Sequence, residues 1–404
     1  MRFSKNLNFA FLNLGHFIDH FTMLIFATVA ALSLIEDWGM SYAELIPYAT
    51  PGFIAFGLFS LPAGWLADKW SREGMMLIFF LGIGISALLT SLANSPIQIG
   101  VGLFLIGVFG SIYHPVGIPL VIQGYSNTGF RIAINGVFGN MGVASAAMLT
   151  GFLIDSNGWK AAFVVPGLII LIVAIGYGIL LITRNRNNLS HQKTTHESLD
   201  YSSTELRLPR SLFLKVFTVV LITTAFGGLI FQGTTFALPK VFDEKLGYLS
   251  MSASSVGTYV FAVLTVASLG QLAVGYLLDH LSIKRVFFWV GVFQFIFFIV
   301  MVGKYGLVAL FVSIGFMVAV FGQIPVNDVL LGRITSDEWR SRVYGLRFVL
   351  GFSVMALTVP LLAWIYSKWS FDILFLCLAA ASVFIILSVM TLPKVINSKP
   401  LPKF

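Results

Sequence analysis

The sequence predicts an all-α integral membrane protein with twelve transmembrane helices, arranged as two parallel six-helix repeats. Composition is the first reason, because 57% of the 404 residues are apolar, only 10% are charged, and the mean hydropathy is +0.91. A soluble chain of this size carries roughly a quarter charged residues on its surface. The other two reasons are twelve apolar runs of spanning length and an internal repeat. Together these observations exclude an ordinary soluble enzyme.

The apolar runs are bounded by polar or turn residues, and about 20 residues suffice to cross a bilayer. The first run is followed by no small-residue cleavage site, so we expect it to remain as a helix. Closely spaced Gly136, Gly139 and Gly142 in the fifth run predict close helix packing. The predicted spans are 8–34, 43–67, 74–93, 98–122, 131–155, 160–182, 213–238, 251–278, 285–303, 306–331, 341–366 and 371–392.

The net charge of +8 is distributed according to membrane topology, so it does not indicate a nucleic-acid partner. With the N-terminus inside, twenty of the 25 Lys and Arg residues fall in cytoplasmic segments, as expected because these residues resist translocation. We therefore expect a multi-pass protein of the bacterial inner membrane with both termini cytoplasmic and the lipid bilayer as its surroundings. The five on the outer side are Lys160, Lys240, Lys245, Lys304 and Lys368.

One long polar stretch divides the chain. Residues 183–211 are rich in Ser, Thr, Asn and charge, which predicts a flexible cytoplasmic linker. It separates an N-terminal six-helix bundle (1–182) from a C-terminal six-helix bundle (212–404). The single cysteine, Cys377, excludes an intrachain disulfide. We expect a monomer without a cofactor.

The two halves contain a sequence repeat. Residues 40–68 align without gaps to residues 251–279 at an offset of 211, and both segments begin with Met-Ser. Two halves with the same membrane orientation are parallel repeats. The matched pairs at this offset include Gly64 with Gly275, Asp68 with Asp279, and Arg131 with Arg342.

The segment GWLADKWSR, from Gly64 to Arg72, resembles a loop motif of the major facilitator superfamily, and GYLLDHLSIKR is a weaker copy at the corresponding place in the second half. The resemblance implies that this motif latches the two halves together on the cytoplasmic side when the site faces outward. Small residues allow close helix approach, and a carboxylate can accept from helix amides and pair with Arg. The alternative is a solvated loop carboxylate. The expected latch residues are Gly64, Asp68, Arg72, Gly275, Asp279, Arg131 and Arg342.

Within that superfamily, LGHFIDHF in the first span and GSIYHPVGIPL in the fourth resemble the fosmidomycin-resistance type of efflux protein. This narrower resemblance implies a secondary transporter that exports a small molecule in exchange for protons. The alternative is uptake of a polar nutrient, metabolite, metal ion or metal chelate, and a membrane sensor or enzyme is more remote. Motifs for ATP hydrolysis or hydrolase chemistry do not occur in the sequence.

Polar and ionisable groups inside the spans are candidates for function because they are costly in lipid. His16, Asp19 and His20 share one helix face by their spacing, and His114 precedes Pro115, which can bend the fourth span. The superfamily resemblance implies that spans one, four, seven and ten line the central cavity. The remaining candidates for proton coupling or substrate binding are Gln232, Gln323, Asn327, Asp328 and Arg347.

The first-span cluster supports more than one hypothesis. A carboxylate flanked by imidazoles can hold and release a proton, as coupling to a proton gradient requires, and Asp19 is the candidate for that role. The imidazoles could instead hydrogen-bond neighbouring helices. A third hypothesis is a divalent transition metal bound by His16, Asp19, His20 and His114. Separately, Asp328 could form a structural ion pair with Arg333 or Arg347.

The orientation can be tested by thiol labelling. In a Cys377→Ser background, a cysteine introduced as His196→Cys in the linker should be protected from an impermeant thiol reagent in intact cells and should react after permeabilisation. This is expected because the Lys and Arg distribution places the linker in the cytoplasm. Labelling in intact cells would overturn the predicted orientation.

Overall fold

A computed structural model describes residues 2–123, 128–189, 209–334 and 337–393 of the chain. The regular elements in these ranges are all helical. The longer helices are α1 (Arg2–Leu32), α4 (Thr50–Lys69), α5 (Arg72–Ser91), α6 (Pro96–Gly110), α8 (Thr128–Asn157), α9 (Ala161–Leu189), α10 (Arg210–Lys245), α11 (Ala253–His280), α12 (Ile283–Met301), α13 (Gly306–Ile334), α14 (Asp337–Lys368) and α15 (Phe371–Met390). The short ones are α2 (Leu34–Trp38), α3 (Tyr42–Leu45), η1 (Ile46–Ala49), η2 (Tyr113–Gly117), α7 (Ile118–Ile122) and η3 (Gly247–Leu249).

The prediction of twelve spans is confirmed, since twelve segments among the described residues are long and apolar enough to cross a membrane. Their order matches the predicted spans, and the two largest differences lie at helix ends. The seventh span extends to Lys245, beyond the predicted 238, and α9 remains helical through Leu189, beyond the predicted domain end at 182. A spanning helix can thus continue past the point where its apolar run stops. The predicted linker, apart from these ends, lies outside the described residues.

The fourth span is not one continuous α-helix. Helix α6 ends at Gly110, and a π-helical turn, η2, follows before α7 begins. Pro115 lies within that turn, where it has no amide hydrogen to donate and cannot complete regular α-helical bonding. The π-helical turn lies at the proline where a bend was predicted, and it places His114 on an irregular backbone.

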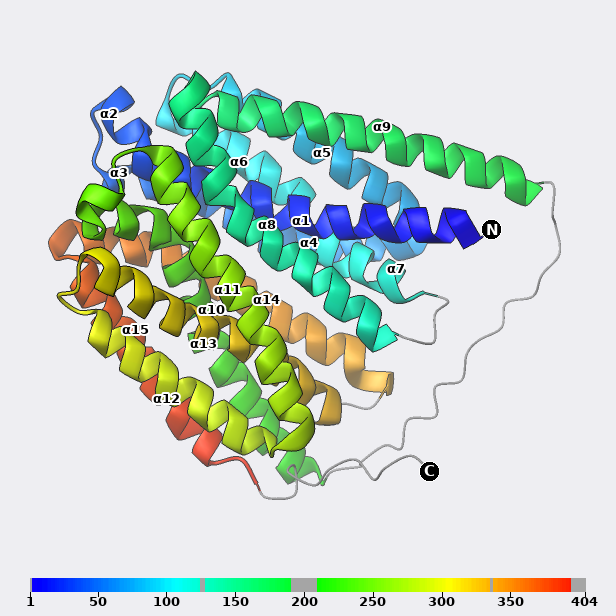
Figure 1. Cartoon of the computed structure of the whole chain (residues 1–404). Helices are drawn as coiled ribbons and strands as arrows, with labels where there is room; N and C mark the ends of the chain where they lie inside the picture. The colour runs from blue at the N-terminus through cyan, green and yellow to red at the C-terminus, as the bar shows by residue number, and fades with distance from the viewer. Residues whose placement is uncertain (1, 124–127, 190–208, 335–336, 394–404) are drawn as a thin grey trace.

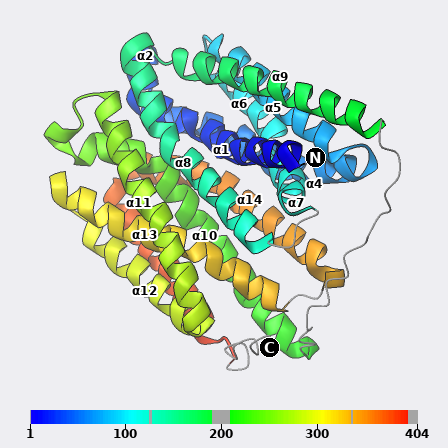
Figure 2. The same cartoon turned by 45° about the vertical axis from the view of Figure 1, so that its right-hand side comes forward.

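The chain forms two halves, α1 to α9 and α10 to α15 (Figure 1). The far end of the molecule holds α2 and α3, and the linker end is where α9 finishes and α10 begins. The halves contact each other through α8 with α11, α1 with α10, and α4 with α14. Figure 2 shows α14 lying against the first half. The site residues on α1, η2, α13 and α14 are positioned by this arrangement.

The closest joint between the halves is the antiparallel pair α8 and α11. A Cβ atom added to Gly151 would lie 2.2 Å from the carbonyl oxygen of Ala253, and one on Gly257 would lie 2.3 Å from that of Ala147. Only glycine permits such backbone contact, which supplies van der Waals attraction where lipid gives no hydrophobic drive. Figure 1 shows the two helices separating from each other toward the linker end.

The carboxylate of Asp155 at the end of α8 strengthens this joint at the far end. It accepts hydrogen bonds from the backbone amides of Ala253 (3.2 Å) and Ser254 (2.7 Å) and from the Ser254 hydroxyl. Those amides belong to the first turn of α11, where helix N–H groups have no partner within the helix. A negative charge there is also favoured by the helix dipole. Asp155 therefore holds one half to the other at the far end.

Glycine packing inside the first half follows the prediction in two of three positions. A Cβ on Gly142 would lie 2.2 Å from the carbonyl oxygen of Phe17, and one on Gly139 would lie 2.6 Å from Nε2 of His16. Gly136 has no neighbouring atom within 4 Å of that position, so close packing is not found there. Gly139 thus leaves room for an imidazole of the candidate site.

The expected latch residues of the first half make separate contacts, and only Asp68 and Arg72 pair with each other. Asp68 and Arg72 form an i,i+4 ion pair of 2.8 Å with both side chains substantially exposed. Gly64 approaches the Pro115 side chain, with 3.2 Å from its added Cβ to the proline Cβ. Arg131 lies over the Phe9 ring at 4.2 Å. The latch itself stays a prediction.

The second copy of the motif is packed differently. The expectation of close helix approach is wrong for Gly275 in this conformation, because nothing lies within 4 Å of its added Cβ. Gly64 meets a proline side chain of its own half, whereas no atom of the described residues occupies the corresponding place beside Gly275. Asp279 is exposed near the end of α11. The side chain of Arg342 lies outside the described residues.

Asp155 and Asp68 should affect the balance of conformations in opposite directions. Asp155→Asn should reduce the population of the conformation in this structure, relative to the alternative one, about fivefold. A carboxylate at a helix N-terminus contributes about 1 kcal/mol. Asp68→Asn should increase that population, because the predicted latch stabilises the alternative conformation in which the linker end is closed. Spin labels on Lys69→Cys and His280→Cys in a Cys377→Ser background report the separation at the linker end. Shifts in the same direction would contradict the assignment.

Candidate functional site

Four of the predicted residues meet inside the first half. Asp19 is completely buried, His16 is 8% exposed, and His20 lies one turn further along α1. His114 reaches the same place from η2, with its ring centroid 5.4 Å from that of His16 and 5.5 Å from that of His20. The predicted common face of His16, Asp19 and His20 is thus completed by the irregular fourth span.

The protonation of His16 is fixed by its neighbours. Its Nδ1 lies 2.8 Å from the backbone carbonyl oxygen of Asn135, which can only accept, so Nδ1 carries the hydrogen. In the neutral ring Nε2 is then an acceptor. Nε2 of His20 lies 3.2 Å away and donates to it. The two first-span histidines therefore form a short chain of hydrogen bonds, in which His20 donates to His16 and His16 donates to the Asn135 carbonyl oxygen of α8.

Asp19 and His114 form the only ion pair described among these four residues. Nε2 of His114 lies 3.4 Å from Oδ2 of Asp19, and the side chain of His114 is 14% exposed. Neither carboxylate oxygen of Asp19 accepts a hydrogen bond from a described residue, and Nδ1 of His114 is also buried without one. A buried carboxylate with so little compensation is costly. The pair therefore depends closely on the packing of the residues around it.

A second polar layer supports the cluster. The amide Nδ2 of Asn135 donates to Asn13 (3.0 Å) and to the Tyr113 hydroxyl (2.8 Å). The Tyr113 hydroxyl in turn donates to the backbone carbonyl of Leu12 at 2.8 Å. The Tyr113 ring stacks on His16 with centroids 4.8 Å apart. These groups tie α1, η2 and α8 together and hold the imidazole of His16 in place.

The same residues have the composition of a transition-metal site. One ring nitrogen from each of His16, His20 and His114 lies within 4.8 Å of the others. Imidazole nitrogen suits Zn²⁺, Ni²⁺ or Cu²⁺, and Asp19 beside His114 is the carboxylate that often orients a ligating histidine. The metal hypothesis therefore stays open beside the proton hypothesis, with the same four residues.

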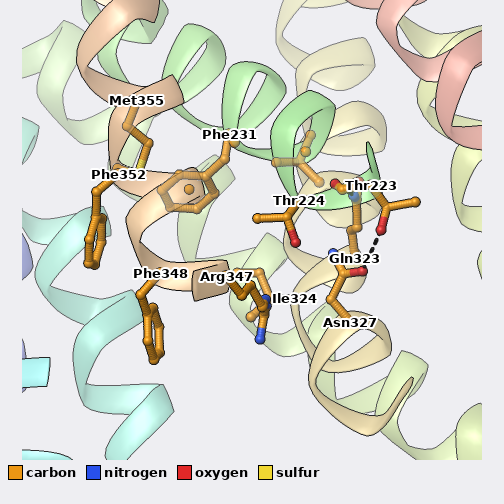
Figure 3. A pocket seen from close by; sticks show the side chains of 14 residues that line it. Thr223, Thr224, Phe231, Gln323, Ile324, Asn327, Arg347, Phe348, Phe352 and Met355 are labelled. Carbon is orange, nitrogen blue, oxygen red and sulfur yellow. Dashed lines mark hydrogen bonds between the residues drawn. The ribbon is translucent and has the colours of Figure 1, made fainter. Parts of the chain in front are cut away.

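A separate cavity of about 190 Å³ lies in the second half (Figure 3). It is formed by α10, α13 and α14, so it differs from the expected cavity lined by spans one, four, seven and ten. The seventh and tenth spans do line it, but the eleventh takes the place of the first two. The lining residues used below are Thr223, Thr224, Phe231, Gln323, Asn327, Arg347, Phe348 and Phe352.

Hydrogen bonds hold most of the polar wall of this cavity. Gln323 donates to the backbone carbonyl of Thr223 at 3.1 Å and accepts from buried Gln294 at 2.9 Å. The hydroxyl of Thr223 donates to Oδ1 of Asn327 at 2.8 Å. Arg347 donates to Asp328, which confirms one of the two ion pairs considered for that carboxylate. The predicted residue Gln232 is buried on α10 outside this cavity.

Two phenylalanines of α14 connect the cluster and the cavity. The rings of Phe348 and Phe352 stack with centroids 5.8 Å apart, and both residues line the cavity. Their centroids also lie 6.1 and 6.0 Å from that of His114 in the other half. A change at either place can therefore reach the other through direct packing.

Sequence reasoning missed several residues that complete these sites. It considered ionisable groups and amides but passed over Asn135, which lies in the second turn of the fifth run. It also passed over the face of the seventh run that carries Thr224, Gly228 and Phe231. A search for uncharged polar side chains within spans finds Asn135. The i, i+4 spacing of Thr224 and Gly228 marks a small, polar face of the helix.

Comparison with known proteins defines the class. The Major Facilitator Superfamily pattern matches residues 12–302, more than half of the chain. The chain therefore belongs to the major facilitator superfamily, and it is a multi-pass membrane protein. The resemblance of two short segments to the fosmidomycin-resistance type goes further than this family match.

Individual relatives are distant. The chain is 28% identical to a gallate transporter of Pseudomonas putida over 37% of its own length and 34% of the relative's. It is 24% identical to the cis,cis-muconate transport protein of Acinetobacter baylyi over 62% of its own length and 60% of the relative's. The chain thus spans less than two thirds of these relatives. Its fold is similar to a solved D-xylose-proton symporter, with a TM-score of 0.69 and 14% identity over 96% of both chains.

Proposed function

We propose that this protein is a proton-coupled secondary transporter that exports a small organic solute across the bacterial inner membrane. The observation that carries the proposal is the buried Asp19–His114 pair, which faces the polar cavity of the other half across Phe348 and Phe352. One half thus offers a group that can exchange a proton, and the other offers a place for a solute. Each chain holds both, so a monomer suffices.

Alternating access requires two conformations related by motion of the halves about a central site. The halves contact each other through the joint of α8 and α11 and through Asp155 at the far end. With the linker end in the cytoplasm, this arrangement is the inward-facing state. The latch motif at Asp68 would then stabilise the outward-facing state by joining the halves at the linker end.

Asp19 is the proposed coupling residue because its surroundings offer two comparable states. Protonated, it is a neutral acid in an apolar site, and ionised, it pairs with a protonated His114. The titratable groups that face it or pack around it are His16 and His20 on its own helix and Tyr113 and His114 on η2. Movement of Phe348 and Phe352 would change the packing around His114 and so favour one state.

Export is supported by the two segments that resemble the fosmidomycin-resistance type, because their residues form one cluster rather than separate features. Uptake is the second candidate. The names of the gallate and muconate relatives support an organic acid as the solute for either direction.

The direction can be measured in everted membrane vesicles with an acidic interior, using radiolabelled gallate and cis,cis-muconate as the first solutes of a larger panel. Exchange of solute for protons should accumulate the solute inside these vesicles. Loss of solute together with protons would establish uptake instead. Solute movement that ignores the pH gradient would exclude proton coupling.

Asp19→Asn should separate exchange from coupling. The amide preserves size and polarity but cannot titrate, so solute exchange across proteoliposomes should continue while accumulation driven by a pH gradient should fall to background. Asp37→Asn, an exposed carboxylate in the same half, is the matched control and should behave as the wild type. Full accumulation by Asp19→Asn would transfer coupling to another residue.

A further inference from the structure

The cavity of the second half has one aromatic side and one polar side. Figure 3 shows Phe231, Phe348 and Phe352 on one side, with Thr224 and Arg347 toward the other. Of the residues that line it, Arg347 alone carries a formal charge at neutral pH. A ligand that fills the cavity would therefore meet a cation at one end and aromatic rings at the other.

Arg347 is buried more deeply than the carboxylate that neutralises it. Its side chain is 13% exposed, whereas that of Asp328 is 50% exposed and does not line the cavity. A guanidinium in a low-dielectric site requires a counter-charge at all times. The carboxylate of Asp328 is already half exposed to water, so leaving Arg347 needs little further hydration. A second carboxylate entering from the cavity can therefore take its place on Arg347.

The unused polar groups of the wall can donate hydrogen bonds. The hydroxyl of Thr224 is buried, with the residue 9% exposed, and it has no hydrogen-bond partner among the described residues. Oδ1 of Asn327 already accepts from Thr223, so the side chain presents its amide N–H groups. Donors of this kind, together with a guanidinium, match an ionised carboxylate, which only accepts.

The remaining wall favours a flat ligand. Phe348 and Phe352 are stacked with an angle of 13° between their rings. Gly227, Gly228 and Gly351 also line the cavity and contribute no side chain to it. Aromatic faces interact well with other planar rings at offset-stacking distance. The cavity has a volume of about 190 Å³, so it can accommodate a small molecule.

We infer that this cavity binds a small planar organic carboxylate, whose carboxylate group displaces Asp328 from Arg347. Binding does not depend on the direction or the coupling of transport. That this cavity is the site of the transported solute rests on the proposed function. The inference gives the two members of one ion pair opposite roles, since Arg347 binds the ligand and Asp328 competes with it.

The experiment measures binding of benzoate to the purified, detergent-solubilised full chain by titration calorimetry, without any gradient. Benzamide, the neutral analogue, should bind at least about tenfold more weakly because it lacks the charge. Cyclohexanecarboxylate, which keeps the charge and loses planarity, should also bind more weakly than benzoate. If benzamide binds as tightly as benzoate, the ligand is not recognised as an anion and the inference is overturned. If cyclohexanecarboxylate binds as tightly as benzoate, the preference for a planar ligand is overturned.

The variants give the sharper test. Arg347→Gln should reduce benzoate affinity at least about thirtyfold, since it removes the buried partner of the carboxylate. Arg347→Lys should recover part of it without the two-pronged geometry. Asp328→Asn should increase affinity several-fold because the competing carboxylate is gone. A purely structural ion pair would instead make Asp328→Asn and Arg347→Gln lose binding alike, which would overturn the inference.

Glu73→Gln and Arg184→Gln form the matched control, because they alter a Glu–Arg pair of the first half that lies outside the cavity, and they should leave benzoate affinity unchanged. Gel filtration checks the fold of each variant. If Arg347→Gln does not fold, benzoate with its two analogues and Asp328→Asn still test whether a carboxylate binds in competition with Asp328. Benzoate binding without pH-driven transport would refute the proposed function alone, whereas pH-driven transport of another solute without benzoate binding would refute this inference alone.

Discussion

The cost of burying the Asp19 carboxylate within the membrane explains much of the first half. Removing one partner of a buried ion pair typically costs about 3–5 kcal/mol, so His114 must be placed accurately. It is placed by the π-helical turn at Pro115, which departs from regular helix geometry at this point of the fourth span. Gly110 gives the carboxylate room, since an added Cβ would lie 3.2 Å from Oδ1 of Asp19. Burial of the Asp19 carboxylate thus requires both an irregular backbone at Pro115 and a small residue at Gly110.

The joint between the halves obeys a different constraint. Lipid is as apolar as the helix faces it covers, so the halves are held by close packing and polar contacts rather than by hydrophobic burial. Gly151 and Gly257 supply the close packing. The carboxylate of Asp155, which accepts from amides in the first turn of α11, supplies the polar contact. Both depend on atoms in direct contact, so their attraction falls steeply with separation. Such a joint suits halves that alternate between two arrangements.

Much of this arrangement could be predicted from the sequence, because hydropathy and spacing are local. The twelve spans follow from apolar runs, and the shared face of His16, Asp19 and His20 follows from helical periodicity. The contribution of Arg347 to the cavity wall was harder to place, because it depends on how far α14 is rotated about its own axis. The role of Asn135 depends on a backbone carbonyl bond to His16, which has no sequence signature. Contacts between spans are set by rotation and register, which composition does not encode.

The distribution of charge between the halves limits how coupling can work. The first half carries a buried carboxylate with histidines, and the second carries a buried guanidinium, with the Phe348 and Phe352 rings between them. Direct attraction through this apolar layer would be strong if either charge lost its own partner, because the local dielectric is low. Each charge is instead neutralised within its own half. A solute that changes the partner of Arg347 must therefore act on His114 through the position of the two rings.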